Sequence, residues 1–147
     1  MSLIRRNLLD VNALIALTNS QHPQYSEAQR WFDSLVNEEW GICPLTEAGY
    51  VRVVTNPASG PIIRTFLQAA AILKDLARRP GYRYWPISGS WAALTASFAT
   101  RITGHQHVTD AYLLGLAIKE DGVLVTFDKG IRYMAGAEFS RNVLILE

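Results

Sequence analysis

The chain has 147 residues, 49% of them hydrophobic and 18% charged, which suits a single globular domain over residues 1–147 and excludes a disordered tail. Its formal net charge of +1 does not by itself predict a polyanionic partner, and its single cysteine, Cys43, excludes a disulfide within the chain. No apolar run is long enough and free enough of polar residues to cross a bilayer, and Asp10 and Asn12 interrupt the N-terminal apolar segment, so that no signal peptide is predicted. We therefore expect a soluble, cytoplasmic protein without a membrane partner.

Short apolar segments alternate with helical patterns along the chain, which is the order expected of a parallel sheet covered by helices. In chain order, the patterns predict a strand at 6–9, helices at 11–18 and 24–36, a strand at 40–43, helices at 45–55 and 61–79, a strand at 82–85, helices at 91–102 and 109–119, a strand at 123–126, a short helix at 131–134 and a closing strand at 143–146. The fold class that follows is α/β, with three layers (α/β/α) around a short-stranded, mainly parallel central sheet.

Two of the predicted helix starts depend on particular residues. Thr46 suits the N-cap of the helix at 45–55, because its hydroxyl can accept a bond from a free backbone N–H group. Pro61 suits the first turn of the helix at 61–79, since a proline loses no helical hydrogen bond there.

Four acidic residues occupy equivalent places in this predicted order. Asp10 ends the first strand, and Asp128 follows the strand at 123–126, while Glu47 and Asp110 each lie in the first turn of a helix. Since strand ends and helix starts of parallel α/β units meet at one edge of the sheet, all four side chains are expected to project from that edge. Polar residues stand beside these acids in the sequence, namely Asn12, Thr46, Thr109 and Thr126.

Clustered carboxylates indicate a site for a hard divalent cation. Without a cation they repel one another, and at least one should take up a proton. Mg²⁺ and Mn²⁺ prefer oxygen ligands, and one or two such ions would activate a water and stabilise the charge of a phosphodiester transition state. A zinc site is not indicated, because Cys43 is isolated and His105 and His107 lack the other ligands of a tetrahedral site. The pattern therefore predicts Mg²⁺, with Mn²⁺ as the alternative.

Three segments resemble, in their order and separation, the motifs of PIN-domain ribonucleases. They are LLDVNALIAL, PLTEAGYVRVVTNP and VTDAYLLGLAIKEDGVLVTFDKGI. More narrowly they resemble the VapC toxins of bacterial toxin–antitoxin pairs, and the segment QHPQYSEAQRWF is typical of one VapC branch. The resemblance spans almost the whole chain and implies a PIN-like fold.

The resemblance also implies a function and a set of site residues. Family members use four acids, here Asp10, Glu47, Asp110 and Asp128, to hold Mg²⁺ or Mn²⁺ and hydrolyse RNA with a metal-activated water. Thr126 matches a supporting hydroxyl of the family, and Asn12 matches a neighbouring polar position. The expected protein is thus a metal-dependent endoribonuclease that acts as the toxin of a toxin–antitoxin pair. Its expected partners are RNA, a small VapB-like antitoxin and a second copy of the chain in a homodimer.

Simpler explanations exist for each feature taken alone. A first-turn acid such as Glu47 can serve only the helix dipole, and Asp128 can be a turn former. His105 and His107 lie just before Asp110, where a histidine can contact RNA, although a loop histidine is more often incidental. At the level of function, the alternatives are a Mg²⁺-binding, receiver-like signalling module and a catalytically inactive PIN-like interaction module. The joint placement of the acids favours the nuclease, because a receiver would need a second acid close to Asp10.

Overall fold

The strands of the protein form one parallel sheet. They are β1 (Arg6–Leu9), β2 (Glu39–Gly41), β3 (Val123–Thr126) and β4 (Val143–Ile145). In the part of the chain that the computed structural model describes, residues 4–147, these four strands are ordered β2-β1-β3-β4, and every neighbouring pair is parallel.

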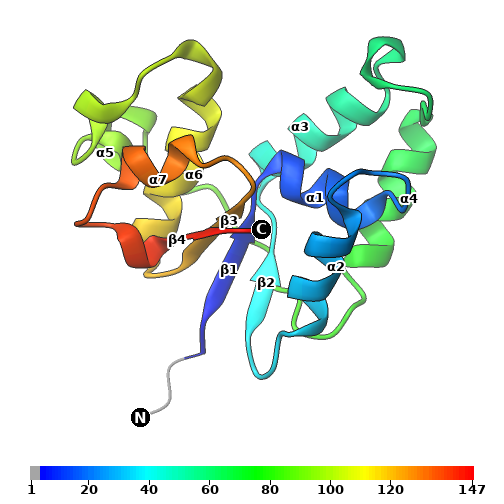
Figure 1. Ribbon diagram of the computed structural model, residues 1–147, viewed down its shortest axis with the longest axis horizontal. Coiled ribbons are helices and arrows are strands. Elements are labelled where there is room, and N and C mark those ends of the chain that lie inside the picture. The colour runs from blue at the N-terminus through cyan, green and yellow to red at the C-terminus, as the bar shows by residue number, and fades with distance from the viewer. Residues whose placement is uncertain (1–3) are drawn as a thin grey trace.

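Helices cover both faces of this sheet (Figure 1). They are α1 (Val11–Thr18), α2 (Tyr25–Asp33), α3 (Pro44–Val54), α4 (Phe66–Leu76), α5 (Trp91–Thr95), α6 (Val108–Lys119) and α7 (Gly130–Ala135). Helices α1 to α4 lie on one side of the sheet and α5 to α7 on the other. The predicted three-layer α/β/α fold is therefore confirmed. Within residues 4–147, no helix has the length and apolar character needed to span a membrane.

Each face of the sheet has its own hydrophobic core. Leu9 packs with Trp40 and Tyr50 among the residues of α1 to α4, whereas Leu8 packs with Trp85 and Phe98 among those of α5 to α7. The two leucines enter opposite cores because successive side chains of a strand point to opposite faces. A central parallel strand is buried on both faces, which is why β3 is recognisable in the sequence as an apolar run. In β1, only Leu8 and Leu9 are apolar, and the strand also contains Arg6 and Asn7.

The register of β1 against β3 sets the position of the site. Leu9 pairs with Val125 in the ladder, and the N–H group of Asp10 donates to the carbonyl oxygen of Val125 at 3.2 Å. The residues at the carboxyl ends of the two strands, Asp10 and Thr126, consequently lie side by side. This is the edge where parallel α/β folds bind ligands.

The predicted start of the helix at 61–79 is wrong. Helix α4 begins at Phe66, and Thr65 is its N-cap, because Gln68 N–H donates to the Thr65 hydroxyl and the Gln68 side chain accepts from the Thr65 N–H. This reciprocal capping box satisfies two backbone N–H groups, whereas Pro61 only tolerates a helix start. The sequence carried both signals, and the capping box determines the boundary.

The strand predicted at 82–85 is also wrong as a member of the sheet. Tyr82 forms one isolated parallel bridge with Trp40. The Arg83 N–H donates to the Trp40 carbonyl at 2.9 Å, and the Trp85 N–H donates to the Ile42 carbonyl at 3.0 Å. Pro86 has no N–H group with which to extend this pairing, so the segment lies along β2 without becoming a strand.

The helix predicted at 91–102 divides into α5 and a 3-10 turn, Ala99–Arg101. The Thr95 hydroxyl donates to the Trp91 carbonyl, and the chain then turns so that Phe98 is fully buried against Phe139. Competition of a threonine hydroxyl for a helix carbonyl is a known cause of such bends.

Replacing Thr65 by alanine should lower the free energy of unfolding by about 1 kcal/mol, since the variant loses the hydroxyl that accepts from Gln68. Pro61→Ala should change the same quantity by less than about 0.5 kcal/mol, because Pro61 is exposed and outside the helix. Urea denaturation of both variants beside the wild type measures the difference. A larger loss for Pro61→Ala than for Thr65→Ala would contradict this helix start.

Candidate active site

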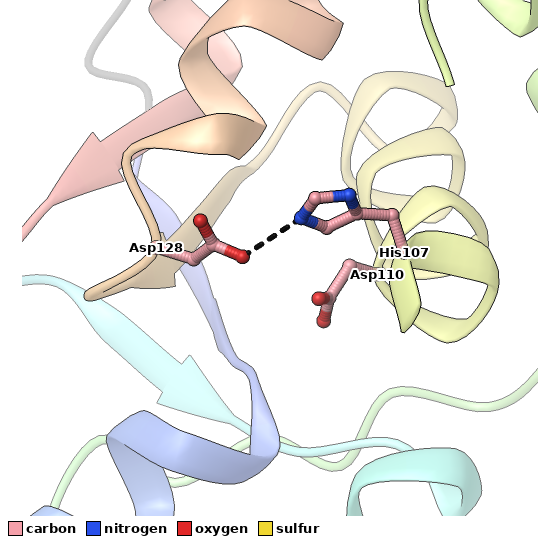
Figure 2. Close-up of side chains that lie close together, drawn as sticks. All are labelled: His107, Asp110 and Asp128. Atoms are coloured by element: carbon pink, nitrogen blue, oxygen red, sulfur yellow. Dashed lines mark hydrogen bonds and ion pairs between the residues drawn. The ribbon is translucent and has the colours of Figure 1, made fainter. Parts of the chain in front are cut away.

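Three side chains from two parts of the chain meet at the carboxyl edge of the sheet (Figure 2). One potential ligand atom from each of His107, Asp110 and Asp128 lies within 4.8 Å of those of the other two. We call these residues the His–Asp–Asp group. Asp110 occupies the first turn of α6, His107 ends the 3-10 turn just before it, and Asp128 follows β3. In Figure 2, the imidazole ring and both carboxylates face a common space.

The Asp128 carboxylate is held from two directions. Its Oδ1 atom accepts a hydrogen bond from the Gly130 N–H at 2.8 Å, at the start of α7. Its Oδ2 atom lies 3.0 Å from Nε2 of His107. Asp128 is therefore a turn former, as its simpler explanation required, and at the same time presents its second oxygen to the His–Asp–Asp group.

Asp10 is a buried carboxylate next to this group, with 2% of its surface exposed. The Ala13 N–H donates to its Oδ1 at 2.8 Å, so Asp10 is the N-cap of α1. The Thr126 hydroxyl donates to its Oδ2 at 2.5 Å and accepts from the Asp128 N–H at 3.0 Å. Through one hydroxyl, Thr126 thus connects the first and fourth acids of the predicted set.

The pKa values of Asp10 and Asp110 are raised by burial and by the neighbouring acids. Burial, reinforced by the charges of Asp110 and Asp128, raises the pKa of Asp10 to about 7, although the bonds from Thr126 and Ala13 oppose the shift. Burial and the charge of Asp128 raise the pKa of Asp110 to about 6, against the opposing effect of His107. Asp110 and Asp128 are therefore near enough to raise the pKa of Asp10, and Asp128 is near enough to raise that of Asp110.

Glu47 differs from the other three acids. It lies in the first turn of α3 as predicted, but its Oε1 atom accepts a hydrogen bond from the Tyr84 hydroxyl at 3.0 Å. Among the described residues, the His–Asp–Asp group includes neither Glu47 nor Asp10. The sequence contained no signal for the bond between Glu47 and Tyr84.

The polar companions of the acids have different surroundings. Thr46 is not the N-cap of its helix, which begins two residues earlier at Pro44; its buried hydroxyl instead donates to the Leu9 carbonyl at 3.0 Å. Thr46 therefore fixes the start of α3 to the end of β1. Asn12 is exposed on α1, and Thr109 is exposed in the first turn of α6.

His107 lies closer to the acids than its position in the sequence indicated. A loop histidine in this position is usually incidental, yet the ring is mostly buried, with 13% of its side chain exposed, and it lies with two carboxylates. The spacing to Asp110 held the missing signal, since residues three apart share one face of a helical turn. The 3-10 turn runs directly into α6, so that this spacing applies across the junction.

The donor atoms of the site fit a divalent cation. Carboxylates suit Mg²⁺ and Mn²⁺, and an imidazole nitrogen is accepted by transition metals. Asp110 and Asp128 present oxygens to one space with His107, and Asp10 adds a third carboxylate beside them. A positive charge there would favour the ionised carboxylates, whose pKa values are raised mainly by burial and further by the neighbouring acids.

Comparison with known proteins identifies the family. The family model described as "PIN domain" matches residues 8–137. The chain therefore belongs to the PIN-domain family, as the resemblance of its motifs implied. The receiver-like alternative is not favoured.

Within this family, the similar proteins are VapC ribonucleases. Ribonuclease VapC39 of Mycobacterium tuberculosis is 37% identical over 130 residues, which cover 88% of this chain and 94% of that protein. Ribonuclease VapC38 of the same organism is 40% identical over 128 residues, covering 87% and 89% of the two chains. A solved structure of FitAB bound to a DNA fragment has a similar fold, with a TM-score of 0.64, 21% identity, and 95% and 94% of the two chains covered.

Without divalent cations, the free energy of unfolding should fall as the pH rises from about 4 to above 7. The pKa of Asp10 is about 7 in the folded protein, against an ordinary value of 3.8, so the folded state binds this proton more tightly. The stability that protonation provides is complete below the unfolded pKa and is lost as the pH rises through the folded pKa. Each tenfold difference in proton affinity is about 1.4 kcal/mol, so the loss should reach a few kcal/mol.

Urea denaturation between about pH 5 and about pH 8 in a chelator measures this dependence. Asp10→Asn cannot ionise, so it should be more stable than the wild type at the upper pH and lose much of the slope. Asp121→Asn is the matched control, because Asp121 is exposed. If the free energy of unfolding depended on pH equally in the wild type and in Asp10→Asn, the raised pKa could not belong to Asp10.

Proposed function

We propose that the protein is a metal-dependent endoribonuclease that acts as the toxin of a toxin–antitoxin pair. The observation that carries this proposal is the convergence of Asp10, Asp110 and Asp128, with raised pKa values for the first two, at the carboxyl edge of the sheet. Its second support is the similarity to proteins named Ribonuclease VapC39 and VapC38.

In the proposed site, Asp110 and Asp128 hold Mg²⁺ or Mn²⁺, and Asp10 supplies the third carboxylate. Thr126 and Ala13 fix both oxygens of Asp10, so this side chain has little freedom to turn away from the cation. Such a cation supplies positive charge against the developing charge of the phosphodiester and lowers the pKa of water. Glu47 is the fourth acid, and Asn12 has at most a supporting role at the exposed rim.

The proposed reaction is hydrolysis of an RNA phosphodiester bond by water. A phosphate backbone brings negative charge to a site that already contains three acids, so basic residues must lie near its path. Lys129 and Arg132 are exposed and closely follow Asp128 in the chain, which suits this role. Arg101 does not, because its guanidinium donates to the Met134 and Ala135 carbonyls at the end of α7.

We propose that the protein forms a homodimer in the cytoplasm and is silenced there by a small VapB-like antitoxin. The start of α4 and the loop before it expose several large apolar side chains, namely Ile62, Ile63, Phe66 and Leu67. Phe66 and Leu67 are 72% and 84% exposed, and several exposed apolar side chains so close together in the chain suit contact with another protein. The free, buried Cys43 suits a reducing compartment.

Purified protein should cleave RNA with Mg²⁺ or Mn²⁺ and lose the activity in a chelator. Asp128→Asn should lower the rate at least about 100-fold, since it removes a charged ligand at the reacting centre. Asp121→Asn is the matched control and should cleave like the wild type. The measurement is the initial rate of cleavage of total bacterial RNA, with the new 5′ ends identified by sequencing.

Two further readings belong to this experiment. Water as the nucleophile does not require the 2′-OH, so a 2′-deoxy nucleotide at the identified cleavage position should still be cut. Expression without an antitoxin should arrest growth, and the Asp128→Asn variant should not. Full cleavage in the chelator, or equal rates for the wild type and Asp128→Asn, would refute the metal-dependent mechanism.

The role of Glu47 can be separated from its bond to Tyr84. If Glu47 serves the cation, Glu47→Gln should reduce cleavage at least about 10-fold. Tyr84→Phe removes only the competing hydroxyl, so this variant should cleave at least as fast as the wild type. Parallel rate measurements on both variants provide the test, and an unchanged rate for Glu47→Gln would remove Glu47 from the site.

A further inference from the structure

The His107 ring has its polar contact on the side that faces the carboxylates. Nε2 lies 3.0 Å from Asp128 Oδ2, whereas Nδ1 is buried and has no hydrogen-bond partner among the described residues. Figure 2 shows the Nε2 side of the ring directed toward Asp128, with the Asp110 carboxylate beside it. Asp128 is thus the acid within hydrogen-bond distance of the ring, and a carboxylate oxygen of Asp110 lies within 4.8 Å of ligand atoms of both residues.

We infer that His107 Nε2 is a direct ligand, with Asp110 and Asp128, of the divalent cation, and that this nitrogen makes the site prefer Mn²⁺ to Mg²⁺. The inference rests on the proposed function for the presence of a cation at this edge. It adds a ligand from outside the four-acid set and a preference between two metals that carboxylates alone leave open.

The spacing of the two atoms agrees with joint ligation. Two ligands at adjacent corners of an octahedron, each about 2.1 Å from a cation, are themselves about 3.0 Å apart. His107 Nε2 and Asp128 Oδ2 have this separation, which is also that of an ordinary N–H···O hydrogen bond, so the two atoms can ligate a cation without moving apart. Asp128 Oδ1 is already bonded to the Gly130 N–H, so Oδ2 is the oxygen that remains available.

The surroundings keep the ring in this place. The His107 N–H donates to the Gly104 carbonyl at 3.0 Å and closes the 3-10 turn. A Cβ atom on Gly130 would lie 3.3 Å from His107 Nε2 and 3.1 Å from Asp128 Oδ1. Because residue 130 has no side chain, the start of α7 can approach the His107 ring and the Asp128 carboxylate closely. These two potential ligands are therefore in position before a cation binds.

The nitrogen determines the metal preference. Carboxylates suit both Mg²⁺ and Mn²⁺, but Mn²⁺, as a transition metal, accepts an imidazole nitrogen more readily than Mg²⁺ does. Loss of the ring should therefore weaken Mn²⁺ binding at least about 10-fold and Mg²⁺ binding less than about 3-fold.

The test uses the full chain and the two metals alone, without RNA. Calorimetric titrations give the dissociation constants of Mn²⁺ and Mg²⁺ for the wild type, His107→Ala and His105→Ala. His105 is the matched control, because it belongs to the same 3-10 turn but is exposed. Pulsed electron paramagnetic resonance of bound Mn²⁺, with ¹⁵N-labelled histidine, should detect one coordinated nitrogen in the wild type and in His105→Ala but none in His107→Ala.

The labelled wild type alone decides the question if His107→Ala fails to fold. Bound Mn²⁺ without nitrogen coupling, or an equal loss of affinity for both metals in a folded His107→Ala, would overturn the inference and leave His107 as a residue that orients Asp128 by a hydrogen bond. If neither metal binds the wild type, this inference and the proposed function both fail. Nitrogen-coupled Mn²⁺ in a protein that cleaves no RNA supports the ligand and refutes the nuclease.

Discussion

The hydroxyl of Thr126 is the contact on which the acidic site depends. It donates to Asp10 at the end of β1 and accepts from the N–H group of Asp128 just beyond β3, so one oxygen atom joins the two strand ends. The pairing of Leu9 with Val125 brings these strand ends together. Asp110, in the first turn of α6, and His107, just before this helix, complete the group with Asp128. Without the hydroxyl, the buried Asp10 would lose a donor to one of its two oxygens, which is costly for a carboxylate away from water.

The site conflicts with the rule that charges avoid the interior, and this conflict is itself informative. A carboxylate that is 2% exposed and surrounded by other acids destabilises the fold when it is ionised. Proteins tolerate such local violations mainly where function requires them. The repulsion between acids and their affinity for a cation have the same electrostatic origin. A bound cation would therefore stabilise the folded state by mass action as well as complete the site.

The sequence was most informative where a polar residue interrupts an apolar run. The positions of Asp10 and Asp128 were predictable because each closely follows a buried strand, and that of Asp110 because it lies in the first turn of an apolar helix. Three features were not predictable, since each depends on a contact between distant segments: the bond of Tyr84 to Glu47, the meeting of His107 with Asp128, and the single bridge that Tyr82 forms beside β2. The start of α4 was a different kind of error. Thr65 and Gln68 carry the local signal of a capping box, which starts α4 at Phe66. Pro61 had predicted an earlier start, because proline is tolerated in the first turn of a helix.

The alternation of Leu8 and Leu9 between the two cores has a consequence for the fidelity of folding. A shift of β1 by one residue against β3 would exchange these side chains between cores that are shaped for other partners, and the same shift would separate Asp10 from Thr126. A misaligned strand therefore cannot give a well-packed molecule with a defective site. The register that packs both cores is also the register that brings Asp10 next to Thr126. Molecules that complete folding therefore have these two residues side by side.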